Sequence, residues 1–361
     1  MFVLMAQSLV YNQKRSEEFF EEVLRPYAKD FIVSACVIDL SKKEPVVFGH
    51  RMDEFVYPAS CYKVFIGAEV LRRIEKGGFS LQTLVEVNSP NDVDNDARIF
   101  PEDRRPLLKV GDKESVDHLL DLMLTRSDNT AANCLIDLVS RESVTQNIVQ
   151  RYGWAGSEVT RKFLDRAKEG EPYRFSETTM SCPRHLAEFF SLVEKNEMVS
   201  PFVSEKLKAY MMGRKSTRGF IMTSEDRVDE YSHTQHPSRR HNTRAIAARI
   251  FQPPVSFYGK GGWLETNLWE HSPLSALKNI FLGKWAVIRW SHDVGVVRNE
   301  DTHFVVCVMS ISKSWHPWHR FPIKKIGDAV FDFISASDPV GQCAQVYGKA
   351  TNQLIRERVD E

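Results

Sequence analysis

The sequence has few cysteines, no net charge and no long apolar run, and each absence excludes a class of protein. Lys plus Arg and Asp plus Glu each total 48, so no overall field favours nucleic acid or an anionic membrane. The six cysteines lie far apart without a Cys-x-x-Cys pair, which argues against common zinc and redox motifs. No stretch reaches the roughly twenty apolar residues of a membrane span. We therefore expect reduced, buried thiols and no binding to nucleic acid or membrane.

The first ten residues are apolar but do not have the pattern of a secretory signal. They lack a basic start and a small-residue cleavage site, and their apolar stretch is short. We therefore expect a cytoplasmic protein, or a periplasmic or secreted one if a signal has been removed. With 361 residues, 42% hydrophobic and 27% charged, the chain can bury one large core or two adjoining subdomains.

The hydrophobic pattern predicts strands at both ends of the chain and helices between them. The predicted strands are 31–39, 45–49, 255–260, 293–297 and 303–311, and the predicted helices are 16–29, one from Ser60, 115–124, 130–138, 142–152, 183–194 and 326–335. Strands from both ends must then share one sheet. The pattern predicts an α+β fold, with an antiparallel sheet flanked by helices and set against an all-helical lobe, leaving a cleft between them.

The most informative local feature is Ser60-x-x-Lys63, which leads into the apolar run 64–71. Residues i and i+3 of a helix project from the same face, so Lys63 can reach Ser60. Serine is a poor nucleophile unless a neighbour takes its proton, and apolar surroundings favour the neutral amine that can do so. The spacing indicates a nucleophile with its own base. The structural alternative is that Ser60 caps a helix whose Lys63 points to solvent.

A second polar group, Ser127-Asp128-Asn129, falls in the turn between two predicted helices. There the Ser127 hydroxyl can relay a proton to a leaving nitrogen, and the Asn129 amide can hold a substrate carbonyl. The same residues also form a favourable helix N-cap, which is the structural alternative.

A third group, Lys260-Gly261-Gly262, ends a predicted strand. Two glycines let a substrate backbone approach closely, and the lysine places an ammonium group near a substrate carboxylate. The structural alternative is an ordinary turn. The stretch 217–249, with its histidines, suggests a solvated loop, and the alternative is a metal or phosphate site. The stretch 315–319, with its tryptophans, suggests the aromatic rim of a pocket, plain packing or a partner surface.

In this order, the three groups resemble the signature of penicillin-recognising serine enzymes, most of all class A β-lactamases. Segments similar to the family's sequences also occur at 124–133, 163–166, 178–180 and 292–297, so the resemblance runs from about residue 16 to 335. It implies one β-lactamase/transpeptidase-like catalytic domain over 1–361, with insertions at about 217–249 and 265–289. The sheet subdomain would comprise about 16–58 and 250–335, and the helical subdomain about 59–249. No metal or cofactor is expected.

The resemblance also implies roles for individual residues. Ser60 would be the acylated nucleophile, Lys63 its proton acceptor, Ser127 a proton shuttle, Asn129 a substrate amide contact and Lys260 a carboxylate anchor. The backbone N–H groups of Ser60 and of Trp263, the residue after Gly262, would form the oxyanion hole.

The chain departs from the family pattern in the loop that would release the acyl group. Class A β-lactamases activate water with a glutamate in a loop that begins Leu-Asp-Arg and continues Glu-Pro. Here four residues separate Arg166 from Glu171-Pro172, three more than in the family pattern. Glu169 competes for the role, and Phe175 replaces an expected asparagine. Glu171 is our candidate base, but a displaced base would leave the ester long-lived. Gly261 also lacks the usual hydroxyl, so we expect weak affinity for ordinary penicillins.

The leading hypothesis is a serine hydrolase that acts on an amide or β-lactam through an acyl-Ser60 intermediate. One alternative is a cytoplasmic acyltransferase or amidase on the same scaffold, in which an amine accepts the acyl group. Another is a non-catalytic ligand-binding or sensor module. The expected partner is a small-molecule amide or lactam, and the sequence predicts no oligomeric state.

Overall fold

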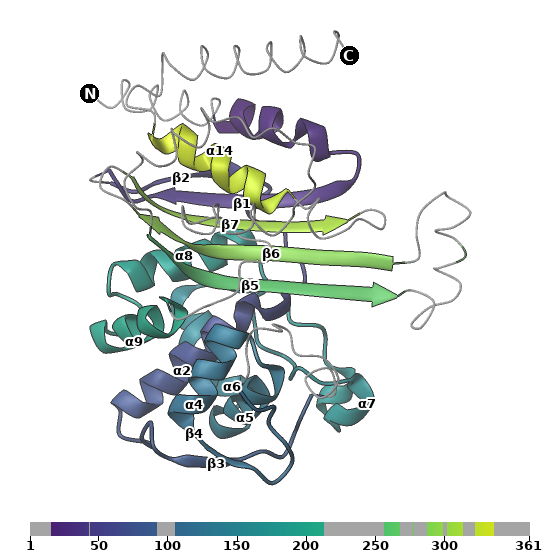
Figure 1. Ribbon diagram of the computed structural model, residues 1–361, viewed down its shortest axis with the longest axis vertical. Coiled ribbons are helices and arrows are strands. Elements are labelled where there is room, and N and C mark those ends of the chain that lie inside the picture. Colours follow the sequence, from purple (N-terminus) through teal and green to yellow (C-terminus); the bar gives the residue numbers. More distant parts are fainter. Residues whose placement is uncertain are drawn as a thin grey trace, which may run out of the picture.

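A computed structural model describes residues 16–42, 44–91, 105–212, 256–267, 277, 287–298, 302–312 and 322–335 (Figure 1). Five strands form an antiparallel sheet in the order β2-β1-β7-β6-β5. They are β1 (Phe31–Asp39), β2 (Val46–His50), β5 (Ser256–Asn267), β6 (Val287–Arg298) and β7 (His303–Ser312). Strand β1 pairs with β2 on one side and with β7 on the other, so both ends of the chain share the sheet, as predicted.

Helices cover both faces of the sheet because the central strands are apolar on both sides. In β1, Val33, Ala35 and Val37 join a core with the helix over 16–24 and with α14 (Ile323–Ser335). The alternate residues Cys36 and Ile38 belong to the larger core on the other face. There α8 (Pro183–Glu194) packs against β1, β6 and β7.

The remaining helices lie next to edge strand β5 (Figure 1). They surround α2 (Lys63–Glu75), which is buried from Lys63 to Arg72 and starts from the 3-10 turn η2 (Ala59–Tyr62). The others are α4 (Val116–Asp121) with π-turn η3 (Leu122–Arg126), α5 (Asn129–Val139), α6 (Arg141–Val144), η4 (Thr145–Val149), η5 (Gln150–Tyr152), α7 (Arg166–Glu169), η6 (Tyr173–Phe175) and α9 (Pro201–Met212). A short 3-10 turn, η1 (Arg25–Tyr27), follows the N-terminal helix. The α+β architecture expected from the sequence is confirmed.

Several predicted elements differ in detail. The helices expected over 115–124 and 142–152 are each interrupted by π-helical turns. Helix α9 and the hairpin of β3 (Leu84–Glu86) and β4 (Lys113–Ser115) were not predicted. The hairpin strands have three residues each and include no buried residue, so they give no alternating pattern. Strands β5 and β6 extend into the expected insertion 265–289, whereas 217–249 and 315–319 lie outside the described residues.

The five described cysteines are buried, as expected, and none forms a disulfide with another described cysteine. Within the described ranges, no group of three or more His, Cys, Asp or Glu side chains is arranged to hold a metal ion. The same ranges contain no helix with the length and apolarity that a membrane crossing would require.

Candidate active site

Ser60 lies in the η2 turn, immediately before the buried helix α2. The preceding residue, Ala59, has a φ of 48°, a left-handed conformation that is uncommon for a residue with a side chain. Cys61 and Tyr62 are buried, whereas Ser60 stays partly accessible. The turn therefore presents one hydroxyl to ligands at the end of a helix that is otherwise enclosed.

The Lys63 side chain points inward and meets the Ser127-Asp128-Asn129 turn. Its Nζ donates hydrogen bonds to the backbone oxygen of Ser127 and to Asn129 Oδ1, the latter at 2.6 Å, and lies 3.4 Å from Ser127 Oγ. Lys63 is fully buried, so the alternative in which it points to solvent is wrong. No hydrogen bond joins Lys63 to the Ser60 hydroxyl within the described part of the chain, so that proton transfer stays a prediction.

Ser127 lies between the amino groups of two lysines, Lys63 and Lys260. Lys260, on β5, donates from Nζ to Ser127 Oγ at 2.7 Å and to the backbone oxygen of Gly261 at 2.9 Å. Ser127 itself adopts a left-handed conformation, with φ 62° and ψ 31°, at the end of the π-turn. Side chains from three separate sequence motifs therefore converge on one hydroxyl.

Asp128 fixes the turn that carries Ser127. Its carboxylate accepts a hydrogen bond from the backbone N–H of Ala131 at 2.7 Å, which caps α5, and pairs with Arg126 at 2.6 Å. Both side chains of that pair are 2% exposed. The predicted N-cap is therefore present, and it positions Ser127 and Asn129 for the contacts with Lys63.

Strand β5 passes directly beside the nucleophile at Gly262. A Cβ at this residue would lie 2.7 Å from the backbone nitrogen of Ser60 and 2.8 Å from the oxygen of Pro58. Only glycine permits this approach, which brings the strand backbone against Ser60 just before Trp263. The Trp263 side chain is 46% exposed.

His292 was not predicted as a site residue, yet it links the segment before Ser60 to the sheet. It pairs with Gly262 across β5 and β6. Its Nδ1 accepts the N–H of Ser310 at 3.1 Å, so Nε2 carries the proton and donates to the oxygen of Tyr57 at 2.9 Å. Burial lowers the pKa of His292 to about 4, so the ring is neutral at physiological pH. The available sequence signal was a histidine directly before the strand predicted over 293–297.

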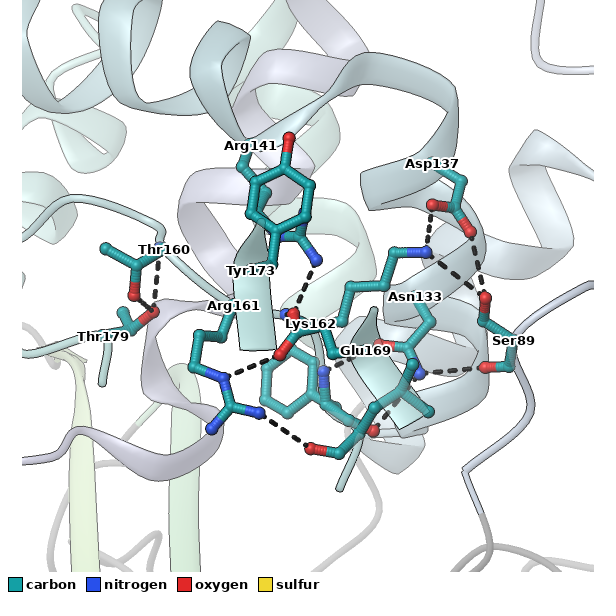
Figure 2. Close-up of polar contacts among 12 residues, drawn as sticks. Ser89, Asn133, Asp137, Arg141, Thr160, Arg161, Lys162, Glu169, Tyr173 and Thr179 are labelled. Carbon is teal, nitrogen blue, oxygen red and sulfur yellow. Dashed lines mark hydrogen bonds and ion pairs between the residues drawn. The ribbon is translucent and has the colours of Figure 1, made fainter. Parts of the chain in front are cut away.

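The loop over 160–179 is fixed by Glu169, the competitor of Glu171 (Figure 2). The Glu169 side chain is fully buried and pairs with Arg141 at 2.5 Å and Arg161 at 2.7 Å. It also accepts the backbone N–H of Lys162 at 2.5 Å. Lys162 in turn pairs with Asp137 on α5. These contacts give Glu169 a structural role in anchoring the loop.

Glu171 is not brought together with the other candidates. It is exposed, and no contact joins it to Ser60, Lys63 or Ser127 in the part of the chain that the structure describes. Phe175, in the place expected for an asparagine, is 76% exposed. The structure therefore assembles Ser60, Lys63, Ser127, Asn129, Lys260, Gly262 and the backbone before Trp263, but not Glu171.

Phe163 contacts the site although the sequence reasoning gave it no role. Its ring stacks on Tyr62 with centroids 4.8 Å apart, and the Nζ of Lys63 lies 4.4 Å from its centre. Asn133 on α5 holds its backbone from both sides: Oδ1 accepts the Phe163 N–H at 2.8 Å, and Nδ2 donates to its oxygen at 3.2 Å.

The sheet and the helices beside it have the β-lactamase/transpeptidase-like fold. The model of the beta-lactamase enzyme family matches residues 15–334, and the chain belongs to this family. A curated β-lactamase from Streptomyces albus G is 25% identical over 167 residues, which cover 45% of this chain and 51% of that protein. The chain thus matches about half the length of this relative.

Solved structures of the class share the fold. The β-lactamase of Sphaerobacter thermophilus DSM 20745 is 17% identical, with a TM-score of 0.59 over 91% of this chain and 99% of that one. PBP-A is 16% identical, with a TM-score of 0.58 over 88% and 95%. A PBP-A variant has been solved as an acyl-enzyme complex with penicillin G. At these identities the similarity shows the fold alone.

Proposed function

We propose that this protein is a serine hydrolase that opens an amide or β-lactam bond through an acyl-Ser60 intermediate. The observation that carries the proposal is the convergence of Lys63 and Lys260 on Ser127 Oγ, at 3.4 and 2.7 Å, beside the Gly262–Ser60 backbone contact. The family membership and the acyl-enzyme known for PBP-A support it.

The contacts support a route for one proton. Ser60 Oγ attacks the carbonyl carbon while its proton passes to the neutral amine of Lys63. The amide C–N bond then breaks, and Ser127 Oγ gives its proton to the leaving nitrogen and regains one from Lys63. Lys260 stays charged and favours the negative charge that develops, with the N–H groups of Ser60 and Trp263 as oxyanion donors.

Substrate recognition is assigned to the start of α5 and to strand β5. Asn129 would contact the substrate amide and Lys260 its carboxylate. Gly261 supplies no hydroxyl beside that carboxylate, so we expect ordinary penicillins to bind weakly. A small-molecule amide or lactam as the natural substrate, and a role in antibiotic resistance, are hypotheses that rest on the family.

Incubation with a chromogenic cephalosporin tests the proposal. We expect turnover, or at least a stoichiometric mass increase on Ser60 in intact-protein mass spectrometry. The Ser60→Ala variant should show neither. If the wild-type protein also shows neither, β-lactams are not its substrates.

The release step has its own test. If Glu171 is the deacylating base, the Glu171→Gln variant accumulates acyl-enzyme, because an amide cannot accept the proton of the attacking water. Unchanged release assigns the step elsewhere. The exposed position of Glu171 makes this the least supported of the predicted roles.

A further inference from the structure

Strand β5 carries Lys260 in a stretch of glycines. The sequence from Tyr258 to Trp263 is Tyr-Gly-Lys-Gly-Gly-Trp, so glycines flank Lys260 on both sides. Glycine has no side chain to pack, and it weakens the interior of a strand. The position of Lys260 therefore depends on the side chains that anchor the strand at the two ends of this stretch.

Tyr258 anchors the first end to the helices. Strand β5 is last in the sheet order and pairs with β6, and helices α8 and α9 lie beside its start (Figure 1). Tyr258 is buried, and its ring packs against Phe190 on α8 with centroids 6.2 Å apart. Its hydroxyl donates to the carboxylate of Glu194, the last residue of α8, at 2.5 Å. At the other end, the Trp263 side chain is half exposed, so the buried anchor is Tyr258.

The carboxylate of Glu194 is held by partners from several elements. Nε2 of His303, the first residue of β7, lies 3.0 Å from it, and the side chains of Lys208 on α9 and Arg298 on β6 lie 3.6 and 3.7 Å away. Lys208 also donates to the backbone oxygen of Glu194 at 2.9 Å. Although burial raises the pKa of Glu194, hydrogen bonds from His303 and Tyr258 help to lower it to about 2. The acceptor of the Tyr258 hydroxyl is therefore an ionised carboxylate at physiological pH.

A carboxylate in this place is costly without such partners. The C-terminal end of a helix disfavours negative charge, and the Glu194 side chain is only 8% exposed. Moving Glu194 away from its cationic neighbours would leave a buried charge uncompensated. Glu194 thus offers Tyr258 a fixed point of attachment.

The position of Tyr258 determines the position of Lys260. Side chains alternate along a strand, so Tyr258 and Lys260 project from the same face of β5, about 7 Å apart. A shift of β5 at Tyr258 therefore carries Lys260 with it. Lys260 Nζ lies 2.7 Å from Ser127 Oγ, and such a hydrogen bond weakens beyond about 3.2 Å. A displacement of about half an ångström is enough to loosen this contact.

We propose that Tyr258 and Glu194 are positioning residues that hold Lys260 where its ammonium group meets the substrate carboxylate and the Ser127 hydroxyl. The inference rests on the proposed acyl-Ser60 chemistry and adds a determinant of specificity outside the three motifs. Substrates that carry a carboxylate depend strongly on this pair, and substrates without one depend on it less.

Two substitutions and a matched control test the assignment. Tyr258→Phe removes the hydroxyl and keeps the ring, and Glu194→Gln keeps the shape and removes the charge. Tyr210→Phe is the control, because it deletes a tyrosine–carboxylate hydrogen bond of the same length, 2.5 Å, that joins α9 to Asp117 on α4. Each protein is treated with penicillin G or a chromogenic cephalosporin and, separately, with the methyl ester of the same compound. Intact-protein mass spectrometry gives the second-order rate constant for formation of the Ser60 adduct.

The ratio of the two rate constants, free acid over ester, is the diagnostic quantity. We expect the wild type to react about 10-fold faster with the free acid, because the ester cannot accept a charge-assisted hydrogen bond as a carboxylate does. In Tyr258→Phe and Glu194→Gln this ratio should fall about fivefold, because Lys260 is displaced. In Tyr210→Phe it should equal that of the wild type. A smaller folded fraction lowers both rate constants equally, so the ratio separates positioning from stability.

Two results would overturn this assignment and leave the proposed function intact. A wild-type ratio in Tyr258→Phe would mean that Tyr258 supports only the fold. Equal reaction of the wild type with acid and ester would mean that Lys260 does not bind the carboxylate, so the pair has no such role. Failure of the wild type to form an adduct with any of the probes removes the proposed β-lactam chemistry and this inference together. If Glu194→Gln does not fold, Tyr258→Phe decides the question.

Discussion

The protein contains two buried polar clusters that are built in opposite ways: a loop cluster around Glu169 and a motif cluster around Ser127. In the loop cluster, two guanidinium groups surround the carboxylate of Glu169, so opposite charges meet. In the motif cluster, the amino groups of Lys63 and Lys260 approach the same hydroxyl of Ser127. Like charges around one neutral group are unfavourable unless one amine is neutral or an anion arrives.

This difference indicates a structural role for the loop cluster and a catalytic role for the motif cluster. A buried carboxylate with two partners is expensive to disturb and has no free capacity for a reaction. A hydroxyl between two amines can exchange a proton with one and be polarised by the other. The comparison predicts that the motif cluster can be altered with a large loss of rate and a small loss of stability, and the loop cluster with the reverse.

The largest effect is expected for Lys63→Met, which keeps the apolar volume but removes the amine. Acylation of Ser60 should slow by about 10³-fold or more, because the proton acceptor is lost. Stopped-flow measurements with a chromogenic cephalosporin check the rate. Lys113→Met, at an exposed lysine on β4, is the control and should acylate normally. Equal rates in both variants would contradict the role of Lys63.

Glu169→Gln should break the loop cluster. Arg141 and Arg161 are 7% and 13% exposed and would lose their anion, so the free energy of unfolding should fall by about 3 kcal/mol. Urea unfolding curves measure this loss. Glu177→Gln, at an exposed loop position, serves as the control. A large drop in acylation at unchanged stability would instead place Glu169 in the chemistry.

Gly262→Ala should disturb the backbone contact that joins the strand to the nucleophile. The new methyl carbon would meet the Ser60 nitrogen at 2.7 Å, so β5 must move away. We expect acylation to fall by about 10²-fold, since an oxyanion donor is displaced. Gly78→Ala, whose nearest contact would be 3.3 Å, is the matched control. A rate equal to that of the control would show that the contact is not needed.

The smallest effect concerns the pH dependence of stability through His292. Because burial lowers its folded-state pKa from 6.5 to about 4, the unfolded chain binds a proton that the folded protein does not. Its contribution is complete above pH 6.5 and is lost progressively towards pH 4, about 1 kcal/mol by pH 5.5.

Urea unfolding at pH 7.5 and 5.5 measures this contribution. The stability loss between the two pH values should be about 1 kcal/mol smaller in His292→Gln than in the wild type. Comparing the two pH values within each protein removes any loss of stability that the substitution causes independently of pH. An identical loss in both proteins would mean that the pKa of His292 does not differ between the folded and the unfolded protein.

Much of the fold could be predicted because it depends on regular patterns. Helix α8 matches its predicted range at both ends, since Pro183 can open a helix and the apolar spacing ends at Glu194. The convergence of Lys63, Ser127 and Lys260 could be expected from their motifs. The short hairpin of β3 and β4 and the π-helical turns could not, because they reflect tertiary contacts rather than local periodicity.

The loop before Thr178 shows where motif reasoning fails. Sequence spacing indicated Glu171 and Glu169 as rivals for one catalytic role, but spacing does not say which carboxylate turns inward. The structure turns Glu169 inward, because Arg141 and Arg161 are there to neutralise it. Phe163 was overlooked because a phenylalanine carries no chemical signal in a sequence; its importance comes only from the lysine beneath its ring.

The close approach at residue 262 has a consequence for recognising active relatives among distant sequences. Serine and lysine at a spacing of three occur by chance in many helices, but a main chain pressed against a serine nitrogen tolerates no side chain at all. A related sequence that retains all four polar side chains but replaces this glycine would keep the motifs and lose the backbone contact with the serine nitrogen. A glycine at position 262 is thus a more stringent marker of an active relative than the Ser-x-x-Lys spacing.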